Sequence, residues 1–134
     1  MSETDEPREP ADEWFEYSAK DPRAAEVLLA QDPPLVESAC FHAQQAVEKA
    51  LKGYLASRSQ PVQKTHDLVA LVRDCAQIDP EFRTLAQLAS GMADYAVEAR
   101  YPDTPFSVTP HEASVAVHTA DGIVRFVRLR VGRK

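Results

Sequence analysis

The amino-acid sequence lacks several features on which large classes of protein depend. Only four glycines occur in 134 residues and no Asn-Gly dipeptide marks a hairpin, so a sheet built from tight hairpins is not expected. No apolar run approaches the roughly 18–20 residues that a membrane span needs. No charged-then-apolar signal peptide opens the chain. We therefore expect a cytoplasmic helical protein without a membrane segment.

Residues for the common catalytic and metal sites are also scarce. The two cysteines, Cys40 and Cys75, each fall on an apolar helical stripe and are expected to be reduced thiols in the core. Cysteine and histidine do not cluster at ligand spacing, so neither a metal site nor another cofactor is predicted. No glycine-rich phosphate loop and no recognisable setting for a nucleophile occurs. Motifs alone therefore assign no catalytic residue.

The negative net charge is concentrated at the start of the chain. Residues 1–16 contain seven acidic residues and one basic residue, which accounts for the whole net charge of −6, and residues 17–134 contain fourteen of each. We predict an acidic, disordered leader at 1–11, one folded domain at 12–131 and a basic tail at 132–134. A neutral domain does not hold nucleic acid by bulk charge, so any nucleotide or RNA contact must come from a local site.

Hydrophobic periodicity predicts an all-α fold. Helical segments cover about 13–30 and 33–58, Thr65 caps a short helix, a fourth segment begins at Asp79-Pro80, and a capping box at Thr109 starts the last one. The last segment is predicted to bury Ala113, Ala116, Val117, Ala120, Ile123, Val124 and Val127. The first segment is interrupted at Asp21-Pro22, which indicates a kink or a restart there. Its predicted inner face comprises Trp14, Tyr17, Ala24, Ala25 and Leu28. The pattern as a whole predicts an up-and-down four-helix bundle with an additional short helix.

The second helical segment carries a polar stripe beside its apolar one. His42, Gln45 and Lys49 are spaced three or four residues apart, so they lie on one side of the helix. Such a stripe next to an alanine-rich seam can bind a nucleotide or line a dimer cleft, although a histidine on a helix flank often serves only as a hydrogen-bonded structural residue. Gly53 lies inside the same helix and indicates a close approach of another helix.

The fourth segment ends in a second group of candidate residues. Arg100, Tyr101 and Asp103 follow its last alanines, and a proline between them ends the helix sharply. A guanidinium at a helix end can pair bidentately with a phosphate or a carboxylate. The alternative is structural, with Arg100 bonding the last carbonyls of its helix or pairing with Asp94 or Asp103.

The segment from Cys40 to Tyr54, taken together with Ala99 to Asp103, resembles the HEPN domain family over about residues 14–127. The resemblance implies the same helical bundle, and a cleft for nucleotide or RNA near the end of the fourth helix. One HEPN subset consists of metal-independent ribonucleases with a histidine four to six residues after an arginine. This chain departs from that pattern, because the first histidine after Arg100 is His111, with three prolines between them.

Three hypotheses about function follow. The resemblance implies a non-enzymatic partner protein that binds nucleotide and acts with a minimal nucleotidyltransferase, in a module of the toxin–antitoxin type. The alternatives are a ribonuclease toxin that uses Arg100 and His111, or a non-catalytic interaction module. The alanine-rich helical faces and Gly53 allow close packing, and the resemblance implies pairing across such faces, as is general in small HEPN bundles. We therefore expect a homodimer with an isologous interface.

Overall fold

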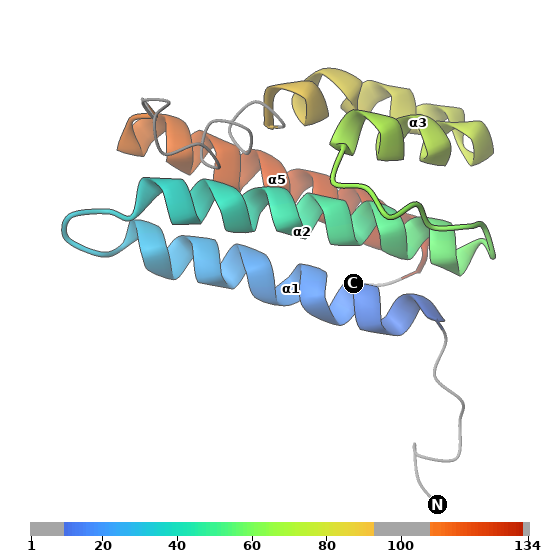
Figure 1. Ribbon diagram of the computed structural model, residues 1–134, viewed down its shortest axis with the longest axis horizontal. Helices are drawn as coiled ribbons and strands as arrows, with labels where there is room; N and C mark the ends of the chain where they lie inside the picture. The colour runs from blue at the N-terminus through green and yellow to red at the C-terminus, as the bar shows by residue number, and fades with distance from the viewer. Residues whose placement is uncertain (1–9, 93–107, 133–134) are drawn as a thin grey trace, which may run out of the picture.

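The computed structural model describes residues 10–92 and 108–132, and these residues are helical apart from short connections (Figure 1). Helix α1 spans Pro10–Leu29, α2 spans Val36–Ser57 and α3 spans Leu68–Ile78. The 3₁₀ helix η2 spans Pro80–Leu85 and continues as an α-helix over residues 86–92. Helix α5 spans Pro110–Arg130. The predicted all-α fold is confirmed.

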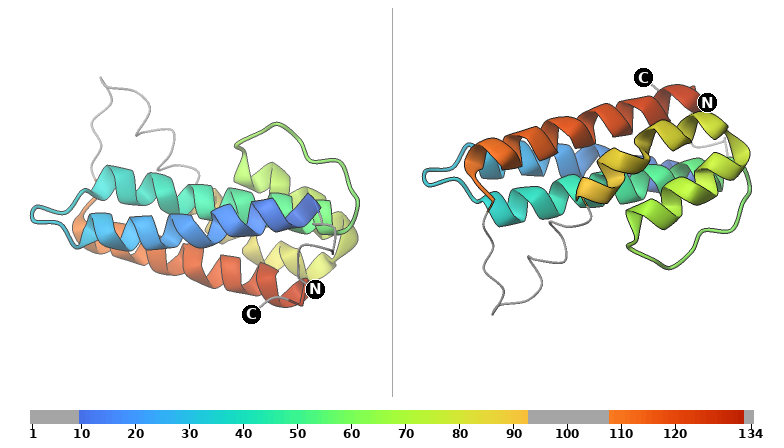
Figure 2. Two further views of the ribbon diagram at one scale, coloured as in Figure 1. Left: turned by 90° about the horizontal axis from the view of Figure 1, so that it is seen from below. Right: turned by 90° about the horizontal axis from the view of Figure 1, so that it is seen from above.

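Helix α2 lies at the centre of the bundle and contacts α1, α3 and α5. It runs antiparallel to α1 and in the same direction as α5, while η2 and residues 86–92 run back over α2 and α5 (Figures 1 and 2). The loop after α2 returns along that helix, so the short α3 starts near its middle and runs parallel to it. The order of directions is that of an up-and-down bundle with α3 as the additional helix.

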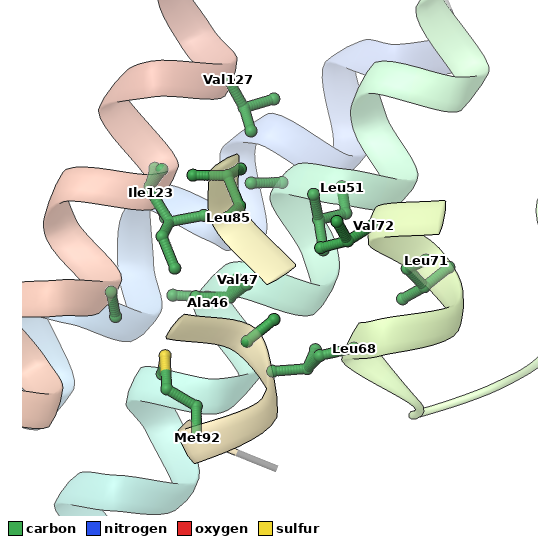
Figure 3. Packing of buried hydrophobic residues seen from close by; sticks show 14 of the residues in the cluster. Ala46, Val47, Leu51, Leu68, Leu71, Val72, Leu85, Met92, Ile123 and Val127 are labelled. Atoms are coloured by element: carbon green, nitrogen blue, oxygen red, sulfur yellow. The ribbon is translucent and has the colours of Figure 1, made fainter. Parts of the chain in front are cut away.

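The core forms where the apolar stripes of α2, α3, η2 and α5 meet, as Figure 3 shows for Leu51, Val72, Leu85 and Ile123. Every position predicted to be buried in α5 is buried in the structure: Ala113, Ala116, Val117, Ala120, Ile123, Val124 and Val127. The inner apolar positions of α2 are buried as well: Ala39, Cys40, Ala43, Ala46, Val47, Ala50, Leu51, Tyr54 and Leu55. Periodicity alone therefore located the core of the two longest helices.

Gly53 allows the close approach that its place inside α2 predicted. A Cβ at this position would lie 2.9 Å from Cζ of Phe15, whose ring comes from α1. The Phe15 side chain is 1% exposed, so α1 is packed against α2 through this ring. Any larger residue at position 53 would push the ring away, which typically costs about 1–3 kcal/mol in a packed core.

The inner face predicted for α1 was wrong in part. Phe15 is buried instead of its neighbours, whereas Tyr17 is 45% exposed and Trp14 is half-buried. The ring of α1 that packs against Gly53 is that of Phe15, one position after Trp14. The inner face of α1 is therefore centred on Phe15 and not on Trp14. Helix α1 also continues through Pro22, so it does not restart at Asp21. Ala25 is buried as predicted.

Two predicted helix starts also need correction, and a third helix starts where predicted but is of another type. Helix α2 begins at Val36, after the turn that contains Asp32-Pro33, and its N-cap residue Leu35 makes no side-chain cap. Asp67, not Thr65, caps α3, since its Oδ1 accepts from the amides of residues 69 and 70 at 3.0 and 3.1 Å. The fourth helix starts at Pro80 as predicted, but as a 3₁₀ helix. The capping box at Thr109 is confirmed.

No helix in the described ranges is long and apolar enough to cross a membrane. Residues 1–9 of the predicted leader and residues 133–134 of the predicted tail lie outside these ranges. Residues 10 and 11, which the prediction placed in the leader, belong to α1 instead, and Ala11 is buried.

Candidate ligand-binding face on helix α2

The predicted polar stripe of α2 lies on one side of the helix, beside α1. His42, Gln45 and Lys49 are all half-buried, so each is held by its neighbours and still reaches the surface. Their spacing of three and four residues places the Cβ atoms of Gln45 about 5–6 Å from those of His42 and of Lys49. Together with Tyr17, Asp21 and Phe41, they form what we call the α2 face.

Asp21 of α1 positions two residues of this face. Nδ1 of His42 donates to Oδ1 of Asp21 at 2.9 Å, and Nζ of Lys49 donates to Oδ2 at 2.8 Å. The Asp21 side chain is only 10% exposed, whereas His42 and Lys49 are 35% and 23% exposed. Because both carboxylate oxygens are used, the imidazole and the ammonium are fixed in orientation relative to each other. A lysine ammonium has three N–H donors, so Lys49 can bind a further acceptor from solvent.

A second carboxylate network borders the face. Oε2 of Glu48 accepts from Nζ of Lys52 at 3.0 Å, and Oε1 accepts from Nδ1 of His66 at 2.9 Å. The side chains of Glu48 and Lys52 are 5% and 7% exposed, while His66 is 60% exposed. Sequence reasoning missed both carboxylates. The Glu48–Lys52 spacing of four residues was a visible signal, but the links from Asp21 and His66 depend on tertiary packing.

Exposed aromatic rings lie among these cations. Nζ of Lys49 is 5.2 Å from the ring centre of Tyr17, and Nζ of Lys52 is 5.6 Å from that of Trp14. Phe41 is 42% exposed and meets the His42 ring edge-on, with 5.7 Å between the ring centres. The α2 face therefore combines fixed N–H donors with accessible aromatic surface.

The remaining candidate residues fall in different places. Arg100, Tyr101 and Asp103 lie outside the described residues. His111 is exposed in the first turn of α5, directly after the Thr109 cap. The pairing of Arg100 with His111 therefore stays a prediction.

The two cysteines are free and buried, as predicted. Burial, with a smaller contribution from Glu112, raises the pKa of the Cys40 thiol to about 11. Burial, with a smaller contribution from Asp74, raises the pKa of the Cys75 thiol to about 12. Thiols with such pKa values are protonated at neutral pH and do not act as nucleophiles. Within residues 10–92 and 108–132, no group of three or more potential ligands could hold a metal ion.

Comparisons with known proteins give a consistent picture. A family model described as HEPN domain matches residues 11–130. The crystal structure of TT1696 from Thermus thermophilus is 32% identical in sequence, with a TM-score of 0.77, over 90% of this chain and 98% of that chain. The crystal structure of ST0689, an archaeal HEPN homologue, is 23% identical, with a TM-score of 0.72, over 90% and 97% of the two chains, and shows the shared fold. No curated protein matches the chain.

Proposed function

This chain belongs to the HEPN domain family, and from that premise we propose that it is a nucleotide-binding partner protein that acts with a minimal nucleotidyltransferase. The link to a nucleotidyltransferase comes from the family resemblance, and the pair would form a module of the toxin–antitoxin type. The proposal that the chain binds a nucleotide rests on the geometry of the α2 face.

The supporting observation is that His42 and Lys49 are held in place next to exposed aromatic rings. A nucleotide presents phosphate oxygens at one end and a planar base at the other. On the α2 face, the remaining donors of Lys49 match the phosphate oxygens. The Tyr17 and Phe41 rings, 45% and 42% exposed, offer surfaces on which a base can stack.

The same face favours binding over catalysis. Asp21 holds His42 and Lys49 in an ion network, and the pKa of the Cys40 thiol on α2 is raised, so this thiol is not a nucleophile at neutral pH. We therefore propose that the chain binds and presents a nucleotide, while the chemistry belongs to the nucleotidyltransferase partner. We further propose a homodimer. Light scattering is expected to give twice the 14.9 kDa chain mass at micromolar concentration, and a monomer would contradict the dimer.

Calorimetric titration tests the nucleotide site. ATP and GTP are titrated into the wild-type protein, into Lys49→Gln and into Tyr17→Ala. Loss of a charge-assisted hydrogen bond should weaken binding about ten- to hundred-fold in Lys49→Gln. Loss of the stacking ring should weaken it by roughly tenfold in Tyr17→Ala. Lys64→Gln removes the same charge from an exposed lysine in the loop before α3 and should bind like the wild type.

A cleavage assay with a short RNA tests the alternative that the chain is a ribonuclease. Incubation with the wild-type protein in the presence of a chelator should leave the RNA intact. RNA cleavage that disappears in His111→Ala would instead establish a metal-independent ribonuclease. Absence of any nucleotide binding by the wild type would reject the nucleotide-binding role and leave an interaction module.

A further inference from the structure

A pocket of about 480 Å³ lies between α3 and η2, and both elements lie on the opposite side of α2 from α1 (Figure 1). Its volume falls in the range of small-molecule sites, roughly 300–1,000 Å³. Two arginines line it, Arg73 from α3 and Arg83 from η2, together with the amide side chain of Gln77. We call it the arginine pocket.

The local helix geometry brings these residues to one pocket. The residues that α3 contributes are spaced three and four apart, which is one face of an α-helix: Val69, Val72, Arg73, Ala76 and Gln77. The residues from the opposite side, Pro80, Arg83 and Ala86, are spaced three apart. In a 3₁₀ helix, side chains three residues apart eclipse one another, so η2 aligns them along one edge of the pocket.

Neither guanidinium forms an ion pair or a hydrogen bond with the described part of the chain. The carboxylates nearest to them in sequence have other partners. Asp74 accepts from Nε2 of Gln63 at 2.7 Å. Asp79 accepts from Nε of Arg130 at 3.2 Å, and Glu81 pairs with the same guanidinium. Two positive charges therefore line one pocket, and no carboxylate in residues 10–92 or 108–132 pairs with either of them.

From this arrangement we propose that the arginine pocket binds the phosphate group of a small phosphorylated molecule with an apolar or planar body. A phosphate dianion carries two charges and enough oxygens for two guanidinium forks, whereas a carboxylate carries one charge and two oxygens. The half-buried Val69, Ala76 and Ala86 form apolar walls for the body of the ligand. This site is separate from the α2 face and does not rest on the function proposed above.

Binding is tested by NMR of the arginine Nε–H groups and by calorimetry, with orthophosphate, AMP and acetate as probes. AMP is expected to bind more tightly than orthophosphate, since its ring adds apolar contact, and acetate is expected to bind weakest. The signals of Arg73 and Arg83 should shift on saturation with AMP. Absence of AMP binding at millimolar concentration, or acetate binding as tightly as orthophosphate, would overturn the proposal.

Substitutions then assign the site. Arg73→Gln and Arg83→Gln should each weaken AMP binding about ten- to hundred-fold, and Arg83→Lys should lie between Arg83→Gln and the wild type because it keeps the charge and loses the fork. Arg23→Gln on α1 removes an exposed guanidinium elsewhere and should change nothing. If AMP affinity is unchanged in both glutamine variants, or falls equally in Arg23→Gln, the assignment is wrong. If Lys49→Gln binds AMP more weakly than the wild type and Arg73→Gln binds it as tightly, AMP binds at the α2 face instead.

Discussion

The α2 face with its bordering network and the arginine pocket each contain two strong cations, but within the described residues only the first region pairs them with carboxylates. Lys49 and Lys52 each bond a carboxylate at 3.0 Å or less, and each carboxylate also holds a histidine. Arg73 and Arg83 have no such partner in the described residues. Removing one partner of a buried pair is costly because it leaves the other charge alone, and the pair fixes geometry. Unpaired, exposed charges contribute little to stability and remain available to a ligand.

The difference also teaches how each region would bind. At the α2 face the donors are already oriented by Asp21, so a ligand needs only the remaining N–H groups of Lys49 and a nearby ring. In the arginine pocket a ligand has to order two flexible side chains, and this loss of side-chain entropy offsets part of the stronger attraction. Substitutions should therefore separate stability from binding.

The largest effect on stability is expected for Glu48→Ala. This change leaves the Lys52 ammonium, 7% exposed, without its carboxylate, and breaking such a buried pair typically costs about 3–5 kcal/mol. Urea unfolding measures the loss. The double variant Glu48→Met with Lys52→Met should recover most of it, because no unpaired charge is then buried. A loss below about 1 kcal/mol in Glu48→Ala would show that the network adds little.

Asp21→Ala should have a smaller effect on stability and a large one on ligand binding. It removes two hydrogen bonds to groups that still reach water, so a loss of about 1–3 kcal/mol is expected in urea unfolding. It also frees His42 and Lys49 to move, and nucleotide affinity should fall. Unchanged nucleotide affinity in a folded Asp21→Ala protein would mean that the fixed orientation is irrelevant to binding.

The buried thiol of Cys75, on the inner side of α3, should lower the free energy of unfolding as the pH rises into the alkaline range. Burial raises the pKa of Cys75 from 9.0 to about 12, so above pH 9 the unfolded chain loses this proton while the folded chain keeps it. Unfolding is thereby favoured as pH rises, by up to about 1.4 kcal/mol per pH unit between these values. The free energy of unfolding of Cys75→Ala should decline less steeply between pH 9 and 10 than that of the wild type. If the free energies of unfolding of the two proteins decline in parallel with pH, the raised pKa of Cys75 is contradicted.

The smallest effect on stability is expected in the arginine pocket. Arg73→Gln and Arg83→Gln break no ion pair within the described residues, so their stability should lie within about 0.5 kcal/mol of the wild type. Thermal unfolding without ligand measures this. A larger loss in either variant would indicate that its guanidinium is structural, and the contrast between the two regions would disappear.

Much of the fold could be predicted from the sequence, because burial follows a helical period that depends on local spacing alone. The core faces of α2 and α5 and the Thr109 cap illustrate this. The inner face of α1 could not, since the choice between Trp14 and Phe15 is made by Gly53, which is distant in sequence.

For the site, the sequence placed His42, Gln45 and Lys49 together but could not identify what holds them. Asp21 lies 21 and 28 residues from its two partners, and its place beside a proline indicated only a kink or a restart of the helix. The arginine pocket was missed for a related reason. The spacing of Arg83 relative to Pro80 has meaning only once η2 is known to be a 3₁₀ helix.

The central claim, that the α2 face binds nucleotide, is tested most directly by mapping NMR shifts of backbone and side-chain N–H groups while ATP is added. We expect the groups of Tyr17, His42, Gln45 and Lys49 to shift together and saturate, with Lys64 unaffected as the control. The same shifts should be strongly reduced in Lys49→Gln. An α2 face that stays unchanged at saturating ATP, wherever else shifts occur, would contradict the claim.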